Sequence, residues 1–254
     1  QKTAGTGYPE IQKIYPQEES QLADVWSKYM PSDRYDCGNI DFCNDGDKLH
    51  SIKTLEDFMS EKILLIDGHS ILNRAFYGLP DLTNSEGKHT GAVYGFLNIL
   101  LRTIEEEKPQ YLTVAFDLKA PTFRHKMFEA YKGTRKPMPE ELREQVPLIK
   151  EMLTAMGVNV VTKEGYEADD ILGTLARKSE AAGIDATILS GDRDLLQLAT
   201  DKVMIRLPKT VRGKTTIEDY HAQQVIEKYQ VTPPQIIELK ALMGDSADNI
   251  PGIP

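Results

Sequence analysis

Four short apolar runs rich in β-branched residues divide the chain, and each is typical of a buried parallel strand. They cover residues 62–67 (KILLID), 111–117 (YLTVAFD), 158–162 (VNVVT) and 185–190 (DATILS). Between them, apolar positions recur at helical spacing over residues 91–105 and 143–156. The alternation predicts an α/β fold of three layers, a mostly parallel central sheet with helices on both faces.

Acidic residues gather in five short groups, most of them where these apolar runs stop. The groups are Asp67; Asp117; Glu167, Asp169 and Asp170; Asp192 and Asp194; and Asp245 and Asp248. In an open α/β sheet, ligands bind outside the carboxyl ends of the strands. We therefore expect these nine acids to converge, and converging carboxylates repel each other unless cations hold them.

Helix capping is the alternative explanation for each acid taken singly. An Asp before a helix is a common N-cap, and acids in a first turn are favoured by the helix dipole. Capping needs one acid per helix, however, whereas GYEADD (165–170) supplies three, and GDRD (191–194) and GDSAD (244–248) supply two each. The joint pattern indicates a metal-dependent phosphodiester site, and Glu167 and Asp170 are spaced to share a helical face.

Carboxylate oxygens without a nearby thiol or imidazole cluster favour Mg²⁺ or Mn²⁺ over zinc. Two such ions, about 3.5–4 Å apart, can bind the attacking and leaving oxygens of an in-line displacement. More acids than one ion needs suggest at least two ions.

Six motifs in this chain resemble, in order and approximate spacing, the 5′-nuclease domain of bacterial DNA polymerase I. They are ILLIDGHSILNRAFY (63–77), VAFD (114–117), TFRHKMFEAYKGTRKPMP (122–139), GYEADD (165–170), SGDRDLLQL (190–198) and LMGDSADNIPGIP (242–254). The resemblance runs from about Met59 to the last residue. It implies a PIN-like 5′-nuclease fold with a flexible basic helical arch, and two or three Mg²⁺ ions, replaceable by Mn²⁺, on the nine acids.

The resemblance further implies 5′-3′ exonuclease and structure-specific flap endonuclease activity during replication and repair. The expected partners are DNA with 5′ flaps, nicks or single/double-strand junctions, and RNA primers, with no membrane. We expect a monomer that in the full-length protein is linked to a polymerase region.

A basic segment between residues 119 and 143 would carry the second half of the mechanism. It holds seven Lys and Arg residues against three acids, with Phe123, Phe128 and Tyr131 interleaved. Basic side chains neutralise phosphates and aromatic rings stack on unpaired bases. A solvated charged helix is the alternative, and we prefer it for Lys119, Lys126 and Arg143.

For YKGTR (131–135), the resemblance favours the functional interpretation over a solvated charged helix. It implies that Lys132 and Arg135 face the scissile phosphate as catalytic residues, with Lys132 the main electrostatic stabiliser of the transition state. The nucleic-acid-binding residues that we expect are Arg74, Arg124, Tyr131 and Lys136. Arg74 and Arg124 could equally be surface ion-pair residues. Gly133, Pro137 and Pro139 interrupt any long helix here, which favours a mobile arch.

Net charge is −9, from 30 basic and 39 acidic residues, which at first argues against a polyanionic substrate. Residues 1–58 hold 6 basic and 11 acidic residues, so residues 59–254 hold 24 and 28. Setting aside the nine acids of the five groups leaves 24 against 19. Once metal ions neutralise that cluster, the nuclease portion presents a mildly positive surface.

Residues 1–58 read differently from the rest and mix Gly, Pro, Asp, Asn and Gln with short apolar pieces. We interpret them as an atypical extension, either a small added module or, as we prefer, sequence upstream of a native start at Met59. Both cysteines, Cys37 and Cys43, lie there. Without a transmembrane stretch or signal peptide, a reducing cytoplasm is the simplest compartment.

The other end of the pattern breaks off at Pro254, where a duplex-binding helical element would follow in the resembling family. We therefore expect residues 59–254 to be the catalytic domain without that element. Two alternative functions stay open: a DNA-junction binding fragment without turnover, and a phosphatase for small phosphomonoesters, which would not need the basic, aromatic segment.

Overall fold

The computed structural model describes residues 61–211 and 214–253; the extension expected over 1–58 and the start expected at Met59 lie outside them. The elements in chain order are β1 (Lys62–Asp67), α2 (Gly68–Gly78), α3 (Gly91–Glu107), β2 (Tyr111–Ala115), α4 (Phe123–Met127), α5 (Glu140–Arg143), α6 (Gln145–Ala155), β3 (Asn159–Val161), α7 (Ala168–Ala181), β4 (Asp185–Leu189), the 3-10 helix η1 (Arg193–Leu198), β5 (Val203–Val211), β6 (Lys214–Tyr220), α8 (Ala222–Tyr229) and α9 (Gln235–Met243).

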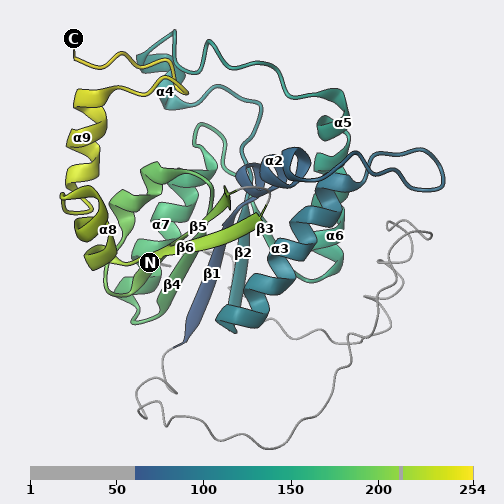
Figure 1. The fold of residues 1–254 in the computed structure, drawn as a ribbon, viewed down its shortest axis with the longest axis horizontal. Helices are drawn as coiled ribbons and strands as arrows, with labels where there is room; N and C mark the ends of the chain where they lie inside the picture. The colour runs from purple at the N-terminus through teal and green to yellow at the C-terminus, as the bar shows by residue number, and fades with distance from the viewer. Residues whose placement is uncertain (1–60, 212–213, 254) are drawn as a thin grey trace, which may run out of the picture.

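A six-stranded, mostly parallel sheet in the order β3-β2-β1-β4-β5-β6 forms the middle layer (Figure 1). Strands β1 to β5 run parallel, and β6 returns antiparallel to β5. Helices lie on both sides of the sheet, with α2, α3 and α6 on one side and α7, α8 and α9 on the other (Figure 1). The predicted three-layer α/β architecture is confirmed.

All four predicted strands form, although three are shorter than expected. β1 matches the prediction, whereas β2 ends two residues before Asp117 and β3 keeps only three residues. The helix predicted over 143–156 forms as α6, and the short α5 precedes it. Pro147 sits in the first turn of α6, where a missing N–H costs nothing.

The sequence prediction missed β5 and β6. The run VMIRLPKTV places Arg and Pro inside β5, and KTTIEDY in β6 is mostly polar, so neither looks like a buried strand. β6 pairs only with β5 and is the edge of the sheet, where polar residues and one solvated face are normal.

Alternating side chains of β1 build the two apolar cores. Leu64 and Ile66 face α2, α3 and α6, whereas Ile63 and Leu65 face α7 on the opposite side. Successive side chains of a strand point to opposite faces, so a strand buried on both sides reads as a continuous apolar run. This is why KILLID was recognisable from sequence.

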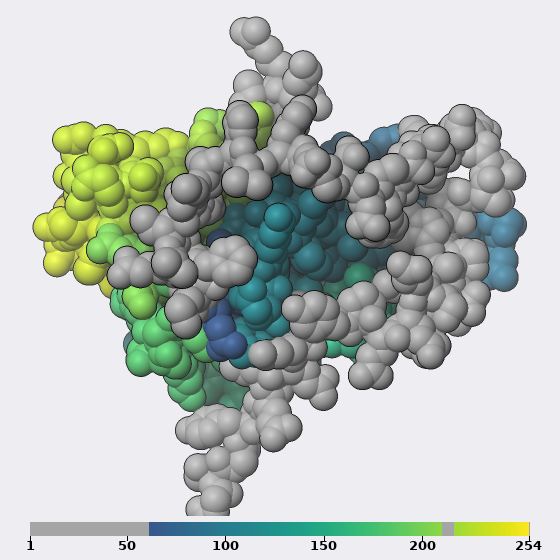
Figure 2. Space-filling view, turned by 90° about the horizontal axis from the view of Figure 1, so that it is seen from below, coloured from purple at the N-terminus to yellow at the C-terminus, as the bar shows by residue number. Residues whose placement is uncertain are grey.

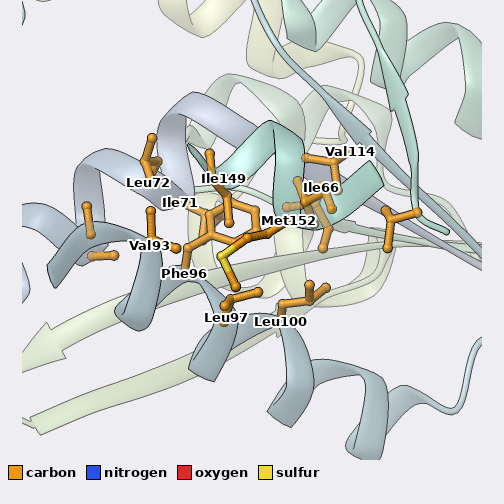
Figure 3. Packing of buried hydrophobic residues seen from close by; sticks show 14 of the residues in the cluster. Ile66, Ile71, Leu72, Val93, Phe96, Leu97, Leu100, Val114, Ile149 and Met152 are labelled. Atoms are coloured by element: carbon orange, nitrogen blue, oxygen red, sulfur yellow. The ribbon is translucent and has the colours of Figure 1, made fainter. Parts of the chain in front are cut away.

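The first core packs Phe96 and Leu100 of α3 against Ile149 and Met152 of α6, with Ile71 of α2 alongside (Figure 3). Each of these side chains is almost completely buried. Viewed from below, the yellow-green C-terminal part of the chain lies at the left, with teal residues in the middle and lighter blue residues at the right (Figure 2). In the described residues, no helix has the length and apolar character needed to cross a bilayer.

A buried ion cluster joins the end of α3 to β5 and β6. The guanidinium of Arg206, a residue 7% exposed, lies 3.0 Å from Glu106, 3.1 Å from Glu107 and 2.8 Å from Asp219. Glu107 also accepts a hydrogen bond from Thr187 of β4. Three acids around one arginine explain how a charged residue comes to lie inside strand β5.

Arg206→Met should lower the free energy of unfolding by about 3 kcal/mol, because it removes the cation shared by Glu106, Asp219 and the buried side chain of Glu107. Urea denaturation followed by circular dichroism measures the change. The matched control is Arg177→Met, which removes an exposed pair with Glu180 and should change stability by less than about 1 kcal/mol. Equal effects of the two substitutions would contradict the structural role assigned to Arg206.

Candidate active site

Five of the nine predicted acids line one cavity of about 380 Å³ at the carboxyl edge of the sheet. Asp67 is the last residue of β1, Asp117 follows β2, and Asp192 follows β4. Glu167 precedes α7, and Asp169 lies in its first turn. Because the parallel strands end at one edge, residues up to 125 positions apart in sequence meet here, as the alternation of strands and helices predicted.

The acids at the strand ends are fixed by hydrogen bonds that also cap helices. Asp67 accepts from the main-chain N–H of Ser70 at 3.0 Å and from the hydroxyl of Ser190 at 2.9 Å. Asp192 likewise accepts from the N–H of Asp194 at 2.8 Å at the start of η1. The capping interpretation is therefore correct for Asp67 and Asp192, and it coexists with their place in the cavity.

The acidic trio begins α7 with a capping box. Glu167 is the N-cap, and its own N–H donates to the carboxylate of Asp170 at 3.0 Å. Asp169 in turn accepts from the N–H of Asp170 at 2.8 Å. Glu167 thus precedes the helix, so the shared helical face predicted for Glu167 and Asp170 is replaced by reciprocal capping.

Basic side chains from the 119–143 segment bind three of the acids directly. Arg124 of α4 forms a bidentate pair with Asp170, at 2.7 and 2.8 Å. Lys132 Nζ lies 2.8 Å from Glu167 Oε1. Such charge-assisted pairs hold the segment down on the acids.

Arg135 is paired with Asp248 and also donates from Nε to the carbonyl of Ala247 at 3.1 Å. This contact joins the basic segment to the loop after α9. Arg135 and Lys132 both line the cavity beside the acids.

Lys240 of α9 is a charged partner that the sequence analysis missed. Its ammonium lies 2.9 Å from Asp194 and 2.7 Å from Asp245 and so bridges two acids from separate groups. The only sequence signal was its position five residues before Asp245, which many surface lysines would share. Asp194, Asp245 and Asp248 do not line the cavity, and Lys240 and Arg135 account for their charge.

Four of the cavity acids have no basic partner of this kind. Within residues 61–211 and 214–253, no Lys or Arg lies within 4 Å of the carboxylates of Asp67, Asp117, Asp169 and Asp192. Burial and the neighbouring charge of Asp170 raise the pKa of Asp169 to about 7. Burial also raises the pKa of Asp67. Concentrated, partly desolvated carboxylates of this kind suit a divalent cation that binds hard oxygen ligands.

The described residues nevertheless contain no group of three or more acidic, His or Cys side chains already gathered around one point as a closed cation site. N–H or hydroxyl groups donate to carboxylate oxygens of Asp67, Asp117 and Asp192. Both carboxylate oxygens of Glu167 accept hydrogen bonds, one from Lys132 and one from Tyr131. The donor chemistry therefore fits Mg²⁺ or Mn²⁺, while internal donors take up the oxygens in this arrangement.

The basic segment is helical only at its two ends. Between α4 and α5, residues 129–134 form turns, as expected from the Gly and Pro residues of the segment, and a long helical arch is absent from the described structure. The N–H of Lys132, a residue with φ of 55°, donates to the carbonyl of Asp248 at 3.0 Å. Asn249 donates to the carbonyl of Ala130 at 2.9 Å. The mobility expected for this segment stays a prediction.

Tyr131 has a different setting from the one expected. Its ring is buried, only 6% of the residue is exposed, and its hydroxyl donates to Glu167 at 2.9 Å. Burial and Glu167 raise the pKa of the phenol. This arrangement does not present the ring to an unpaired base, whereas Phe123 and Tyr166, whose ring centroids lie 5.9 Å apart, are exposed. The sequence analysis did not single out Tyr166, the residue directly before the acidic trio.

The other predicted nucleic-acid-binding residues lie in different environments. Lys136 is exposed beyond the turn. Arg74 is part-buried on α2, where burial lowers the pKa of its guanidinium. Arg124 points to Asp170, which raises the pKa of that guanidinium and makes it an ion-pair residue in this structure.

Comparisons with known proteins agree with this geometry. The family model described as 5′-3′ exonuclease, N-terminal resolvase-like domain, matches residues 62–230. DNA polymerase I of Bacillus subtilis is 51% identical over 194 residues, which are 76% of this chain and 22% of the relative. The thermostable DNA polymerase I of Thermus thermophilus is 42% identical over 192 residues, again 22% of its length. The chain thus spans about a fifth of the curated relatives that it matches.

Solved structures with the same fold come from bacteriophage T5. The T5 D15 protein co-crystallised with metal ions has a TM-score of 0.59 and 24% identity, and the match covers 76% of this chain and 70% of that protein. A T5 D15 flap endonuclease variant, in a pseudo-enzyme–product complex with DNA and metal ions, gives 0.58 and 22%, with the same coverage. The strand order, the acidic cavity and the family match over more than half of the chain lead to one conclusion. This chain belongs to the 5′-3′ exonuclease family, in its N-terminal resolvase-like domain.

Proposed function

We propose that this chain is a divalent-metal-dependent 5′ nuclease that hydrolyses phosphodiester bonds in DNA. Its substrates would be 5′ flaps, nicks and single/double-strand junctions, together with RNA primers, cut both exonucleolytically and as flaps. The observation that carries the proposal is the cavity in which five acids lie together with Lys132 and Arg135. Acids alone would suit cation storage, and basic residues alone would suit simple binding; phosphodiester hydrolysis needs both.

Asp67, Asp117, Glu167, Asp169 and Asp192 would hold the first cation, because they line the cavity. Asp170, Asp194, Asp245 and Asp248 are the predicted ligands around it, for a total of two or three Mg²⁺ ions, with Mn²⁺ as a substitute. When bound, such ions supply an activated water and charge neutralisation at the leaving oxygen. The T5 relatives bound to metal ions support this assignment.

The basic residues of the chain would act on the phosphate. Lys132 and Arg135 are held near the cavity by Glu167 and Asp248, and each can exchange its carboxylate for a phosphate oxygen of the substrate. A positioned ammonium or guanidinium stabilises negative charge that develops on the phosphate. Lys132 is the better placed of the two, because its side chain is the less exposed.

The physiological setting follows from the relatives. In a longer protein, this chain would be the 5′ nuclease portion of a DNA polymerase I and would act in the cytoplasm during replication and repair.

A DNA-junction binding role without turnover is the second candidate. The pairing of Arg124, Lys132, Arg135 and Lys240 with acids favours it, since these pairs take oxygens that cations would need.

Replacing Asp117 or Asp192 with Ala should reduce Mg²⁺-dependent cleavage of a labelled 5′-flap substrate by about 1,000-fold or more, since several kcal/mol of metal-dependent stabilisation is lost. The assay uses residues 59–254 with and without Mg²⁺, in burst and multiple-turnover formats. Asp201→Ala, on an exposed turn, is the control. Undiminished cleavage by correctly folded Asp117→Ala and Asp192→Ala proteins would refute the nuclease assignment, and flap binding without a burst would favour the second candidate.

Lys132→Ala should slow single-turnover cleavage by about 100- to 1,000-fold, the usual effect of removing one stabiliser of transition-state charge. Binding of flap DNA, measured by fluorescence anisotropy, should change by less than about tenfold, since other cations keep the phosphates bound. Lys126→Ala is the matched control, because Lys126 is an exposed lysine of the same segment. If Lys132→Ala weakened binding and cleavage equally, Lys132 would be a binding residue only.

Asp169→Asn should raise the melting temperature of the metal-free protein at pH 8 by about 2–4 °C, the equivalent of roughly 1 kcal/mol, because a buried charge beside Asp170 disappears. Added Mg²⁺ should then stabilise the wild type more than the variant. Differential scanning calorimetry with and without EDTA measures both effects, and Asp201→Asn serves as control. A lower melting temperature for metal-free Asp169→Asn would show that no such repulsion exists.

A further inference from the structure

His69 contacts the cavity acid Asp117 through one ring nitrogen. The main-chain N–H of Asp117 donates to His69 Nδ1 at 3.2 Å, and the same nitrogen lies 3.4 Å from the Asp117 carboxylate. His69 belongs to the first turn of α2, and Asp117 follows β2, so the contact joins segments 48 residues apart. No site role has been given to this histidine so far.

The imidazole is held rigidly by its packing. Its ring meets the buried ring of Phe116 edge-on, with centroids 5.2 Å apart and planes at 87°, and 19% of the side chain is exposed. Gly68 allows this approach, since a Cβ there would lie 2.4 Å from the Phe116 ring. The start of α2 is thereby pressed against the residues that lead into Asp117.

The Asp117 carboxylate is contacted from two sides. Its Oδ1 accepts from the N–H of Ala168 at 2.7 Å, and its Oδ2 is the oxygen that lies 3.4 Å from His69 Nδ1. The part-buried main-chain N–H of Asp117 donates to the same ring nitrogen. The ring therefore contacts both the main chain and the carboxylate of Asp117.

These contacts link the start of α2, the segment after β2 and the start of α7. His69 at the start of α2 holds the segment of Asp117, and Asp117 caps the start of α7 through Ala168. The Asp117 side chain is 42% exposed, and no Lys or Arg in residues 61–211 or 214–253 lies within 4 Å of its carboxylate. His69 and Ala168 are thus the groups that orient this acid.

We propose that His69 is a positioning residue for Asp117: its imidazole fixes the segment after β2 so that the Asp117 carboxylate faces the cavity and binds a divalent cation. This inference rests on the proposed metal-dependent function. His69 acts through Asp117, whose main-chain N–H and carboxylate its Nδ1 contacts. Groups that orient a metal-binding side chain typically change metal affinity or activity 10- to 100-fold.

Three substitutions separate positioning from packing. His69→Asn places an amide oxygen close to the Nδ1 position, His69→Gln places its amide close to Nε2, and His69→Ala offers no acceptor. Mn²⁺ titration followed by electron paramagnetic resonance should show 10- to 100-fold weaker binding for the Ala and Gln variants and less than threefold weakening for Asn. The Mg²⁺ concentration for half-maximal flap cleavage should rise in the same order, while KM for flap DNA stays within about twofold.

A second measurement uses the metal-free proteins. The amide hydrogen of Asp117 should exchange with solvent faster in His69→Ala than in the wild type, because it loses its acceptor, and unchanged exchange would overturn the inference. Wild-type Mn²⁺ affinity in His69→Ala, or an Asn variant as impaired as Ala and Gln, would also overturn it. If the wild type bound no Mn²⁺, the proposed function would fail, and the exchange of the Asp117 amide together with the melting temperatures of the Asn and Gln variants would still decide whether His69 holds the Asp117 segment.

Discussion

Mutual repulsion among carboxylates at the carboxyl edge of the sheet is the constraint on which the rest of the structure depends. The strand order forces five acids into one cavity, and their charge has to be compensated. The chain does this by two means. N–H and hydroxyl donors fix Asp67, Asp117 and Asp192, whereas Lys and Arg side chains reach in from α4, the turn at 128–135 and α9. Of the predicted acids, those that have no Lys or Arg partner within the described residues, Asp67, Asp117, Asp169 and Asp192, all line the cavity.

Much of the fold could be predicted from sequence because β1, β2 and β4 are buried on both faces and therefore read as apolar runs. β5 could not, since Arg206 interrupts its pattern and only the folded chain brings Glu106, Glu107 and Asp219 around that residue. An apolar-run criterion finds the central strands and the apolar edge strand β3, and it misses β5 and β6, where polar residues are stabilised by partners distant in sequence.

The candidate site, like the fold, could be predicted from sequence only in part. Motif spacing identified all five cavity acids, because their positions follow from strand ends. It could not reveal that Tyr131 is buried against Glu167, or that Lys240 bridges Asp194 and Asp245, since these contacts depend on the path of the chain after α4 and α9. Capping also does not exclude Asp67 from the cavity, because this residue accepts from the helix N–H of Ser70 and from Ser190 and still lines the cavity.

The contacts between residues 130–135 and the loop after α9 limit the local stability of this part of the chain. It brings together residues 112 to 119 positions apart through main-chain and polar contacts at exposed positions, such as those of Arg135 and Asn249, with little apolar burial. Contacts of this kind open at a small fraction of the global unfolding free energy. Amide hydrogens around Lys132 should therefore exchange with solvent well before those of β1.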